Sequence, residues 1–262
     1  MSIDSILSIL IKVIINNGGA EYRYEGREEL TPDQKRRLKN QIMSIFEVMG
    51  PIMIGPSSSH TAGSVKLGKL ARFIAGKKVQ RAVLKLHGSF ATTYRGHGTD
   101  KALIAGLLGF DPDDVRIRRA FTHAEENDLQ YEFEKIELRG VHPNTVIFEL
   151  YTEDKEKLTI RGSSLGGGEV IINSIDEYEV EITGKYDTLW IVHKDMPGMV
   201  GRITALLGSY NVNIASMKNQ RRKKRDVASS IIELDQIIPD ALFEHLKNIP
   251  DIDFVRRIPG LK

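Results

Sequence analysis

Hydrophobic residues in the middle of this chain alternate between the spacing of helices and the spacing of strands. Apolar side chains at intervals of three and four residues predict a helix over residues 62–75, and similar patterns predict helices over 99–108 and 115–127. Alternating apolar positions predict strands at residues 81–88, 130–138, 145–151, 158–160 and 169–172. The central part of the chain is therefore expected to mix helices and strands.

Beyond a junction near residues 184–186 the hydrophobic pattern becomes more regular. It predicts a strand at 188–193, a helix at 200–210, strands at 212–218 and 226–234, a helix at 240–248 and a strand at 254–258. This βαββαβ order over about 75 residues is that of a ferredoxin-like unit.

The first 42 residues differ from the rest of the chain. An apolar run at 3–15 contains Asp4 and Lys12, and a strongly charged segment follows at 21–39. The run lacks a basic leader and a cleavage pattern, so we do not interpret it as a signal peptide. Because Met43 begins a segment that looks like a natural start, residues 1–42 are expected to be a non-native extension. A helical N-terminal arm is the alternative.

Composition excludes several kinds of site. The chain contains no cysteine, so it cannot form a disulfide, a thiolate zinc site or a catalytic thiol. Its 37 basic and 35 acidic residues give a net charge of +2, which argues against a protein that coats nucleic acid. No stretch approaches the roughly 20 apolar residues that span a bilayer. We therefore expect a cytoplasmic protein with neither a membrane nor a nucleic-acid partner.

The sharpest motif lies between residues 50 and 63. Two glycine–proline pairs precede a run of hydroxyls and one imidazole, immediately before the predicted helix. Such a turn presents hydroxyl and backbone N–H donors at a helix N terminus, which is a ready site for a carboxylate or phosphate. A histidine there can shuttle a proton near neutral pH. An ordinary capped loop with a surface histidine is the alternative. The residues concerned are Ser57, Ser58, Ser59, His60 and Thr61.

A second histidine, His97, stands between Gly96 and Gly98. The glycines imply a tight backbone and an imidazole that neighbouring side chains do not shield. Thr99 and Asp100 then open the next predicted helix. Taken alone, this segment is better interpreted as a glycine-rich turn in which Asp100 caps the helix.

Two further motifs are weak when taken singly. In the sequence His142-Pro143-Asn144, the proline fixes an extended turn that leads into a strand. Residues 163–168 end in three glycines, Gly166, Gly167 and Gly168, which allow the backbone to approach a small ligand closely. The same glycines are also compatible with a simple bulge or hairpin turn.

Taken in order, these motifs closely resemble those of the β subunit of iron–sulfur L-serine dehydratases. The resemblance extends from residue 43 to about residue 260 and is carried by residues 46–61, 88–90, 96–100, 142–144 and 164–168. It implies an α+β fold, with a mixed α/β serine dehydratase β domain at 43–184 and a ferredoxin-like ACT domain at 187–262. The first domain would be of the kind shared with the allosteric substrate-binding domain of some phosphoglycerate dehydrogenases.

The resemblance also implies an activity and a partner. The family deaminates L-serine to pyruvate and ammonia, as an L-serine ammonia-lyase, with a [4Fe–4S] cluster that cysteines of a partner α subunit hold. The absence of cysteine from this chain fits that division, and we expect the chain to supply no metal ligands. Loss of water from serine requires removal of a weakly acidic Cα proton and departure of hydroxide. An open iron site acts as a Lewis acid, and protein groups orient the substrate and take the proton.

By the same resemblance, His60 and His97 are the residues expected to handle the proton and orient the substrate, without a firm division of roles. The substrate L-serine would be bound by Ser57, Ser58, Ser59, Thr61, Gly98, Thr99, Asp100, His142, Asn144, Gly166, Gly167 and Gly168. The other histidines, His87, His123, His193 and His245, are expected to be structural.

The ACT resemblance adds a possible regulatory ligand. The turn that contains Asp195 and Gly198, together with the strand near Asn213, would bind an amino acid, and an ACT-mediated homodimer is possible. A purely structural ACT unit is the alternative.

The basic run at 221–225 falls where a hairpin tip is expected, so a solvated tip is favoured over a nucleic-acid contact. An amino-acid-sensing subunit without a catalytic role is the alternative function, and no Schiff-base lysine signature of the pyridoxal-phosphate type is evident.

Overall fold

The computed structural model describes residues 11–16, 19–24, 52–154, 157–221 and 226–261. The chain divides into two compact units, residues 1–49 and residues 50–262. In the first unit, strands β1 (Ile11–Asn16) and β2 (Gly19–Tyr24) pair as an antiparallel hairpin. The alternative of a helical arm is therefore wrong for these residues. The predicted start at Met43 lies outside the described residues.

The second unit begins with a six-stranded mixed sheet in the order β4-β3-β5-β6-β7-β8. Strands β3 and β4 are parallel, and the other neighbours are antiparallel. The strands are β3 (Val79–His87), β4 (Gln130–Ile136), β5 (Thr145–Thr152), β6 (Lys157–Gly166), β7 (Glu169–Ile175) and β8 (Tyr178–Ile182). The five predicted strands are confirmed, whereas β8 was not predicted, and β6 continues to residue 166, beyond the predicted strand at 158–160.

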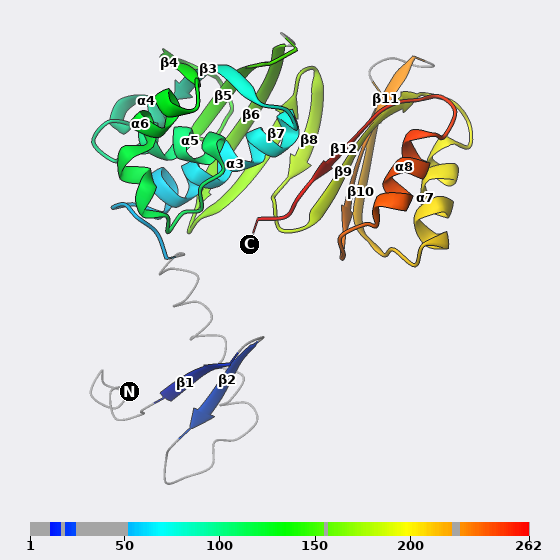
Figure 1. Cartoon of the computed structure of the whole chain (residues 1–262), viewed down its shortest axis with the longest axis horizontal. Helices are drawn as coiled ribbons and strands as arrows, with labels where there is room; N and C mark the ends of the chain where they lie inside the picture. Colours follow the sequence, from blue (N-terminus) through cyan, green and yellow to red (C-terminus); the bar gives the residue numbers. More distant parts are fainter. Residues whose placement is uncertain (1–10, 17–18, 25–51, 155–156, 222–225, 262) are drawn as a thin grey trace. The chain divides into compact units, whose positions relative to one another are not determined.

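Helices pack against one face of this sheet (Figure 1). They are the π-helix η1 (Ser58–Ala62), α3 (Gly63–Ala75), α4 (Gly88–Thr93), α5 (Thr99–Leu108), the 3₁₀-helix η2 (Val115–Arg119) and α6 (Ala120–Glu126). The predicted helices at 62–75 and 99–108 are confirmed, and the one at 115–127 is divided between η2 and α6. The core between helices and sheet includes Leu67, Leu70, Leu84, Leu103 and Phe148, which are fully buried.

Helices α3 and α5 approach each other through two glycines. A Cβ atom on Gly106 would lie 2.1 Å from the backbone oxygen of Val65, and one on Gly68 would lie 2.4 Å from the oxygen of Leu103. No side chain fits in so short a gap. The crossing of the two helices therefore depends on glycine at both positions, and it sets where their N-terminal ends lie.

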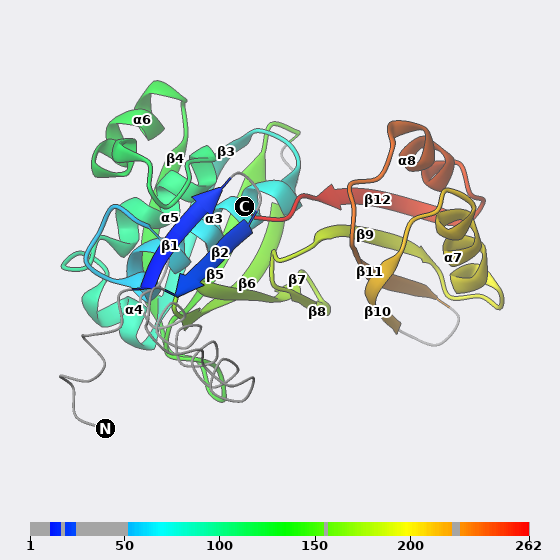
Figure 2. The same ribbon diagram turned by 90° about the horizontal axis from the view of Figure 1, so that it is seen from below.

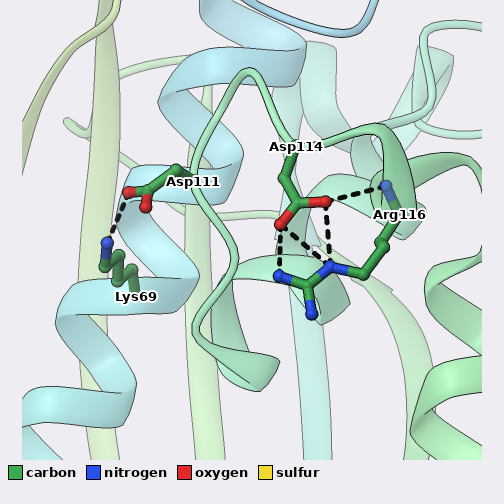
Figure 3. Close-up of polar contacts among 4 residues, drawn as sticks. All are labelled: Lys69, Asp111, Asp114 and Arg116. Carbon is green, nitrogen blue, oxygen red and sulfur yellow. Dashed lines mark hydrogen bonds and ion pairs between the residues drawn. The ribbon is translucent and has the colours of Figure 1, made fainter.

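The loop between α5 and η2 anchors the segment that leads into η1. Asp111 forms an ion pair with Lys69 of α3, and the Asp114 carboxylate caps η2 by accepting a backbone N–H at 2.9 Å (Figure 3). Between these two anchors, the carbonyl of Pro112 accepts the backbone N–H of Ile54 at 2.8 Å. The turn before η1 is thus tied to a loop that is itself fixed at both ends.

The rest of the second unit is a four-stranded antiparallel sheet in the order β10-β11-β9-β12. Its elements are β9 (Asp187–Lys194), α7 (Met199–Ser209), β10 (Ile214–Arg221), β11 (Val227–Leu234), α8 (Asp240–Lys247) and β12 (Ile252–Ile258). Both helices cover one face, where Leu189 and Ile191 of β9 meet them (Figure 2). Trp190, which points to the other face, belongs to the core of the six-stranded sheet.

The predicted fold class is therefore confirmed: the chain is α+β, with a mixed α/β domain followed by a ferredoxin-like βαββαβ unit of the ACT kind. Arg221 ends β10, and residues 222–225 of the basic run lie outside the described residues. Among the residues that the structure describes, no helix combines the length and apolar character needed to cross a membrane.

Candidate functional site

His60 lies in the first turn of the helical segment formed by η1 and α3. Ser57 caps this segment in an extended conformation, and its hydroxyl accepts the backbone N–H of His60 at 3.1 Å. The N–H of Thr61 donates to the carbonyl of Ser57 at 2.8 Å. The run of hydroxyls in the sequence therefore folds as a capped helix start, as its residue types predict.

The imidazole of His60 contacts a hydroxyl through each nitrogen. Nε2 lies 3.1 Å from the Ser89 hydroxyl, and Nδ1 lies 3.4 Å from the Ser57 hydroxyl. The ring of His97 meets it edge to face, with 4.8 Å between the ring centroids, and Phe90 packs against it at 5.3 Å. The fold thus brings together the two histidines that the sequence singled out. A second contact supports this arrangement, because the hydroxyl of Thr61 donates to the backbone carbonyl of His97, 36 residues later, at 3.4 Å.

The surroundings of His60 favour its neutral form. Partial burial lowers the pKa of the imidazole below its usual value of 6.5, and the nearby His97 lowers this pKa further. A histidine with a depressed pKa is unprotonated at neutral pH, and it can then accept a proton. The site therefore offers a general base.

His97 reaches this position because the backbone turns sharply after α4. Its N–H donates to the carbonyl of Thr93 at 3.0 Å, and the following Gly98 has a left-handed conformation with φ of 70°. The side chain of His97 is exposed, whereas His60 is only partly exposed. The pair therefore has one half-buried member, His60, and one exposed member, His97.

The glycine loop after β6 lies against the same helix start. Gly166, Gly167 and Gly168 all have positive φ, between 58° and 106°, and a Cβ on Gly166 would lie 3.9 Å from the Ser59 hydroxyl. The ammonium of Lys66 donates to the carbonyl of Gly168 at 2.9 Å, which ties this loop to α3. The loop predicted to approach a ligand therefore borders the hydroxyl run.

The segment His142-Pro143-Asn144 forms its hydrogen bonds with its own loop, Ser89 and Ser164. His142 accepts the backbone N–H of Asn144 through Nδ1 at 3.1 Å, so this nitrogen is turned into its own loop. The carbonyl of Pro143 accepts the N–H of Ser89 at 2.9 Å, and the amide of Asn144 donates to the carbonyl of Ser164 at 3.5 Å. The segment thus connects to the site through Ser89.

Thr99 and Asp100 begin α5 and are buried. The carboxylate of Asp100 accepts the N–H of Lys101 at 2.8 Å, so it binds the N terminus of its own helix. Burial raises the pKa of this carboxyl, and the hydrogen bond partly opposes the shift. The N-cap residue of α5 is Gly98, and no side chain caps this helix, so the interpretation of Asp100 as the cap is wrong. A substrate contact of Asp100 stays a proposal.

Three residues at the site are not among the candidates that the sequence singles out. Ser89 contacts His60, Lys66 holds the glycine loop, and Ser164 lies so close to Gly63 that a Cβ there would be 2.1 Å from its hydroxyl. Ser89 and Ser164 belong to the segments 88–90 and 164–168 that carry the family resemblance. That membership is the only signal in the sequence that points to them.

The regulatory candidates occupy two ends of the ferredoxin-like unit. Asp195 follows β9 and pairs with Arg221 at the end of β10, at 3.4 Å, and Gly198 precedes α7. Asn213 precedes β10 and donates to Asp235 at 2.5 Å. Since β10 has eight residues, the two groups are about 25 Å apart along the strand. A single copy of the chain therefore does not bring them together.

The other histidines have local partners. His193 is 2% exposed, and its ring nitrogens contact the Lys194 carbonyl at 2.8 Å and the Ser230 hydroxyl at 3.0 Å. His87, His123 and His245 contact the Leu138 N–H, Glu126 and Tyr210 respectively. In the described part of the chain, no group of three or more histidine, aspartate and glutamate side chains is arranged to hold a metal ion.

Comparisons with known proteins place the chain in a family. The family described as "Serine dehydratase beta chain" matches residues 44–134. The probable L-serine dehydratase β chain of Bacillus subtilis is 38% identical over 215 residues, which are 82% of this chain and 97% of that protein. The L-serine dehydratase β chain of Peptoniphilus asaccharolyticus is 38% identical over 200 residues, 76% of this chain and 90% of its own length.

Among solved structures, the ACT domain from GTP pyrophosphokinase of Chlorobium tepidum covers 27% of this chain and 94% of its own length, at 19% identity and a TM-score of 0.24. A score this low carries no weight for the fold, so the ferredoxin-like assignment depends on the strand order described above. The two β chains, in contrast, are matched over nearly their whole length. This protein belongs to the family of L-serine dehydratase β chains.

Proposed function

We propose that this chain provides the proton acceptor and part of the L-serine pocket of an iron–sulfur L-serine dehydratase, which releases pyruvate and ammonia. The observation that carries the proposal is the pair of imidazoles, with 4.8 Å between the centroids of His60 and His97, at a hydroxyl-lined helix start. A depressed pKa at His60 suits removal of a Cα proton at neutral pH. His97, on the open side, orients the substrate.

The remaining pocket residues are assigned by their places around this pair. Hydroxyls at the helix start and backbone groups of the glycine loop bind the amino and carboxylate groups of L-serine through hydrogen bonds. The assigned residues are Ser57, Ser58, Ser59, Thr61, Gly98, Gly166, Gly167 and Gly168, with Thr99, Asp100, His142 and Asn144 in supporting positions. The proton taken from Cα moves to His60, and the Cβ hydroxyl departs and leaves the site as water. The resulting enamine tautomerises to an imine, which hydrolyses to pyruvate and ammonia.

This chain does not fit as the ligand set of an iron–sulfur cluster. Such clusters are held by cysteine thiolates, and the sequence contains no cysteine. The described residues also offer no group of three or more metal-binding side chains. We therefore assign the [4Fe–4S] cluster to a cysteine-bearing α subunit. The residues of this chain bind L-serine and take its Cα proton, and neither role requires them to hold the cluster. The assembly would operate in the cytoplasm.

A double variant tests the catalytic role against a purely sensory one. In a complex purified with its α subunit without oxygen, His60→Gln combined with His97→Asn is expected to abolish pyruvate formation from L-serine. Pyruvate is measured by coupled reduction with lactate dehydrogenase. Normal turnover in the double variant, together with L-serine binding by the isolated chain, would instead favour an amino-acid-sensing subunit.

The pH dependence of the reaction is expected to follow His60. Because its pKa lies below 6.5, kcat/KM should remain high through pH 6.5 and fall as the pH decreases through the lowered pKa, where the imidazole becomes protonated. The variant His97→Asn removes one of the two causes of the shift, so the acid limb should move toward higher pH. An acid limb unchanged by His97→Asn would contradict this origin.

The partner that carries the cluster must reach the rim of this site. Leu165, at the tip of β6 beside the glycine loop, is a large apolar side chain that is 50% exposed at this rim. We expect Leu165→Asp to weaken association with the α subunit by about tenfold or more, equivalent to roughly 1.4 kcal/mol. The measurement is the dissociation constant from biolayer interferometry.

Ile237 provides the matched control for Leu165. It is 76% exposed and precedes α8 in the ferredoxin-like unit. Ile237→Asp should leave the dissociation constant unchanged, and both variants should keep the wild-type melting temperature because neither side chain is buried. Equal losses of affinity in the two variants would show that Leu165 has no special place in the interface.

The regulatory assignment requires two copies of the chain. Asp195 and Gly198 of one copy and Asn213 of a second copy would have to bind the same amino acid across a homodimer, because one copy holds them at opposite ends of β10. Sedimentation of the purified chain with and without L-serine tests for this homodimer.

A further inference from the structure

We propose that Ser89 is a positioning residue that selects the reactive nitrogen of His60. Its hydroxyl accepts the Nε2 proton of the imidazole and leaves Nδ1 as the atom that takes the substrate proton. This inference depends on the proposed role of His60 as the base, and it adds the atom that reacts and the residue that determines it.

The two hydroxyl contacts of His60 are unequal. Ser89 lies 3.1 Å from Nε2, within normal hydrogen-bond distance, whereas Ser57 lies 3.4 Å from Nδ1. The Ser57 hydroxyl also accepts the backbone N–H of His60 at 3.1 Å, which fixes it as the helix cap. Nδ1 is therefore the more weakly held nitrogen. A neutral imidazole carries one proton, and the partner of one nitrogen decides which nitrogen keeps a free lone pair.

Ser89 is itself held in place by a rigid backbone arrangement. Gly88 has a φ of 58° and lies so close to the next loop that a Cβ would be 2.6 Å from the carbonyl of Pro143. That same carbonyl accepts the N–H of Ser89 at 2.9 Å. The hydroxyl of Thr93 donates to the Ser89 carbonyl at 2.8 Å, one turn further along α4. The position of Ser89 is thus determined by a turn that only glycine can form.

This arrangement gives the segment His142-Pro143-Asn144 a role that does not require substrate contact. Pro143 binds Ser89, and Ser89 binds His60, so the segment acts on the base through one intermediate residue. Groups that orient a metal-ligating histidine through its other ring nitrogen typically contribute tenfold to a hundredfold when removed, and we expect the same range for the partner of a catalytic histidine. Ser89→Ala should therefore lower kcat by roughly that factor in the assembled enzyme with little change in KM.

The direct test is spectroscopic and uses the full chain alone. In the protein labelled with ¹⁵N-histidine, long-range ¹H–¹⁵N spectra distinguish a protonated from an unprotonated ring nitrogen, and comparison with His60→Gln assigns the signals. At pH 7.5 the wild-type chain is expected to show a protonated Nε2 and an unprotonated Nδ1 at His60. In Ser89→Ala the two forms should exchange, with an averaged shift, and Ser89→Thr should restore the wild-type pattern.

Ser209→Ala is the matched control, since it removes an exposed serine hydroxyl that donates to the Leu206 carbonyl in α7. It should leave the His60 signals and kcat unchanged. A proton on Nδ1 in the wild-type chain, or identical His60 signals in wild type and Ser89→Ala, would overturn the inference. Neither result depends on turnover, so failure of this inference is distinguishable from failure of His60 as the base, which would appear as normal turnover in His60→Gln.

Discussion

Replacing His60 with glutamine is expected to lower kcat of the assembled enzyme for L-serine by about a hundredfold to ten-thousandfold, the usual contribution of a positioned general base. Glutamine preserves polarity and approximate size at the start of η1, so the fold should be retained. Its amide cannot accept the Cα proton. The measurement is pyruvate formation under anaerobic conditions at saturating L-serine, with the melting temperature determined in parallel.

His123 is the matched control for this substitution. It lies on α6, where its Nδ1 contacts the exposed carboxylate of Glu126 at 2.8 Å. His123→Gln should therefore keep wild-type turnover. If His60→Gln and His123→Gln behaved alike, the site built around His60 would have no special place in the reaction.

Replacing Gly106 with alanine is expected to lower the free energy of unfolding by about 3 kcal/mol, near the upper end of the usual cost of overpacking. The added Cβ would lie 2.1 Å from the Val65 carbonyl oxygen and 2.8 Å from the Cα of Gly68. Both are backbone atoms, so relief requires α3 and α5 to separate. Urea denaturation followed by circular dichroism measures the change.

Gly208 in α7 is the matched control, because a Cβ there would meet nothing within 4 Å and the residue is helical. Gly208→Ala should raise the free energy of unfolding by roughly 0.5 to 1 kcal/mol, through the lower entropy of the unfolded chain. Equal effects of the two substitutions would mean that the close helix crossing does not constrain the fold.

The fold was predictable wherever local periodicity decided the structure. The helix at 99–108 and the βαββαβ order after residue 187 follow directly from apolar spacing. Prediction failed where residue type suggested a different structure. The strand predicted at 158–160 stops short of the glycines that begin at residue 166, yet pairing with β7 extends β6 through Gly166. Strand β8 has only five residues, too few for a clear alternating pattern.

The candidate site was only partly accessible from sequence. His60 and His97 were chosen through family resemblance, and the folded chain places their rings in contact. The contact of Ser89 with His60 spans 29 residues and arises where β3 ends at a glycine turn, so no periodicity signals it. For the regulatory candidates the sequence suggested a shared site that one copy of the chain does not form. Only the folded sheet shows that Asp195 and Asn213 lie at opposite ends of β10.

In the proposed enzyme, this chain gives the base to a dehydration whose metal another polypeptide holds. The most direct test measures pyruvate release from L-serine by the cluster-loaded α subunit, without oxygen, with this chain added or left out. We expect release only when the chain is present, in proportion to its amount up to a fixed subunit ratio. An α subunit that forms pyruvate equally fast without this chain would contradict this expectation.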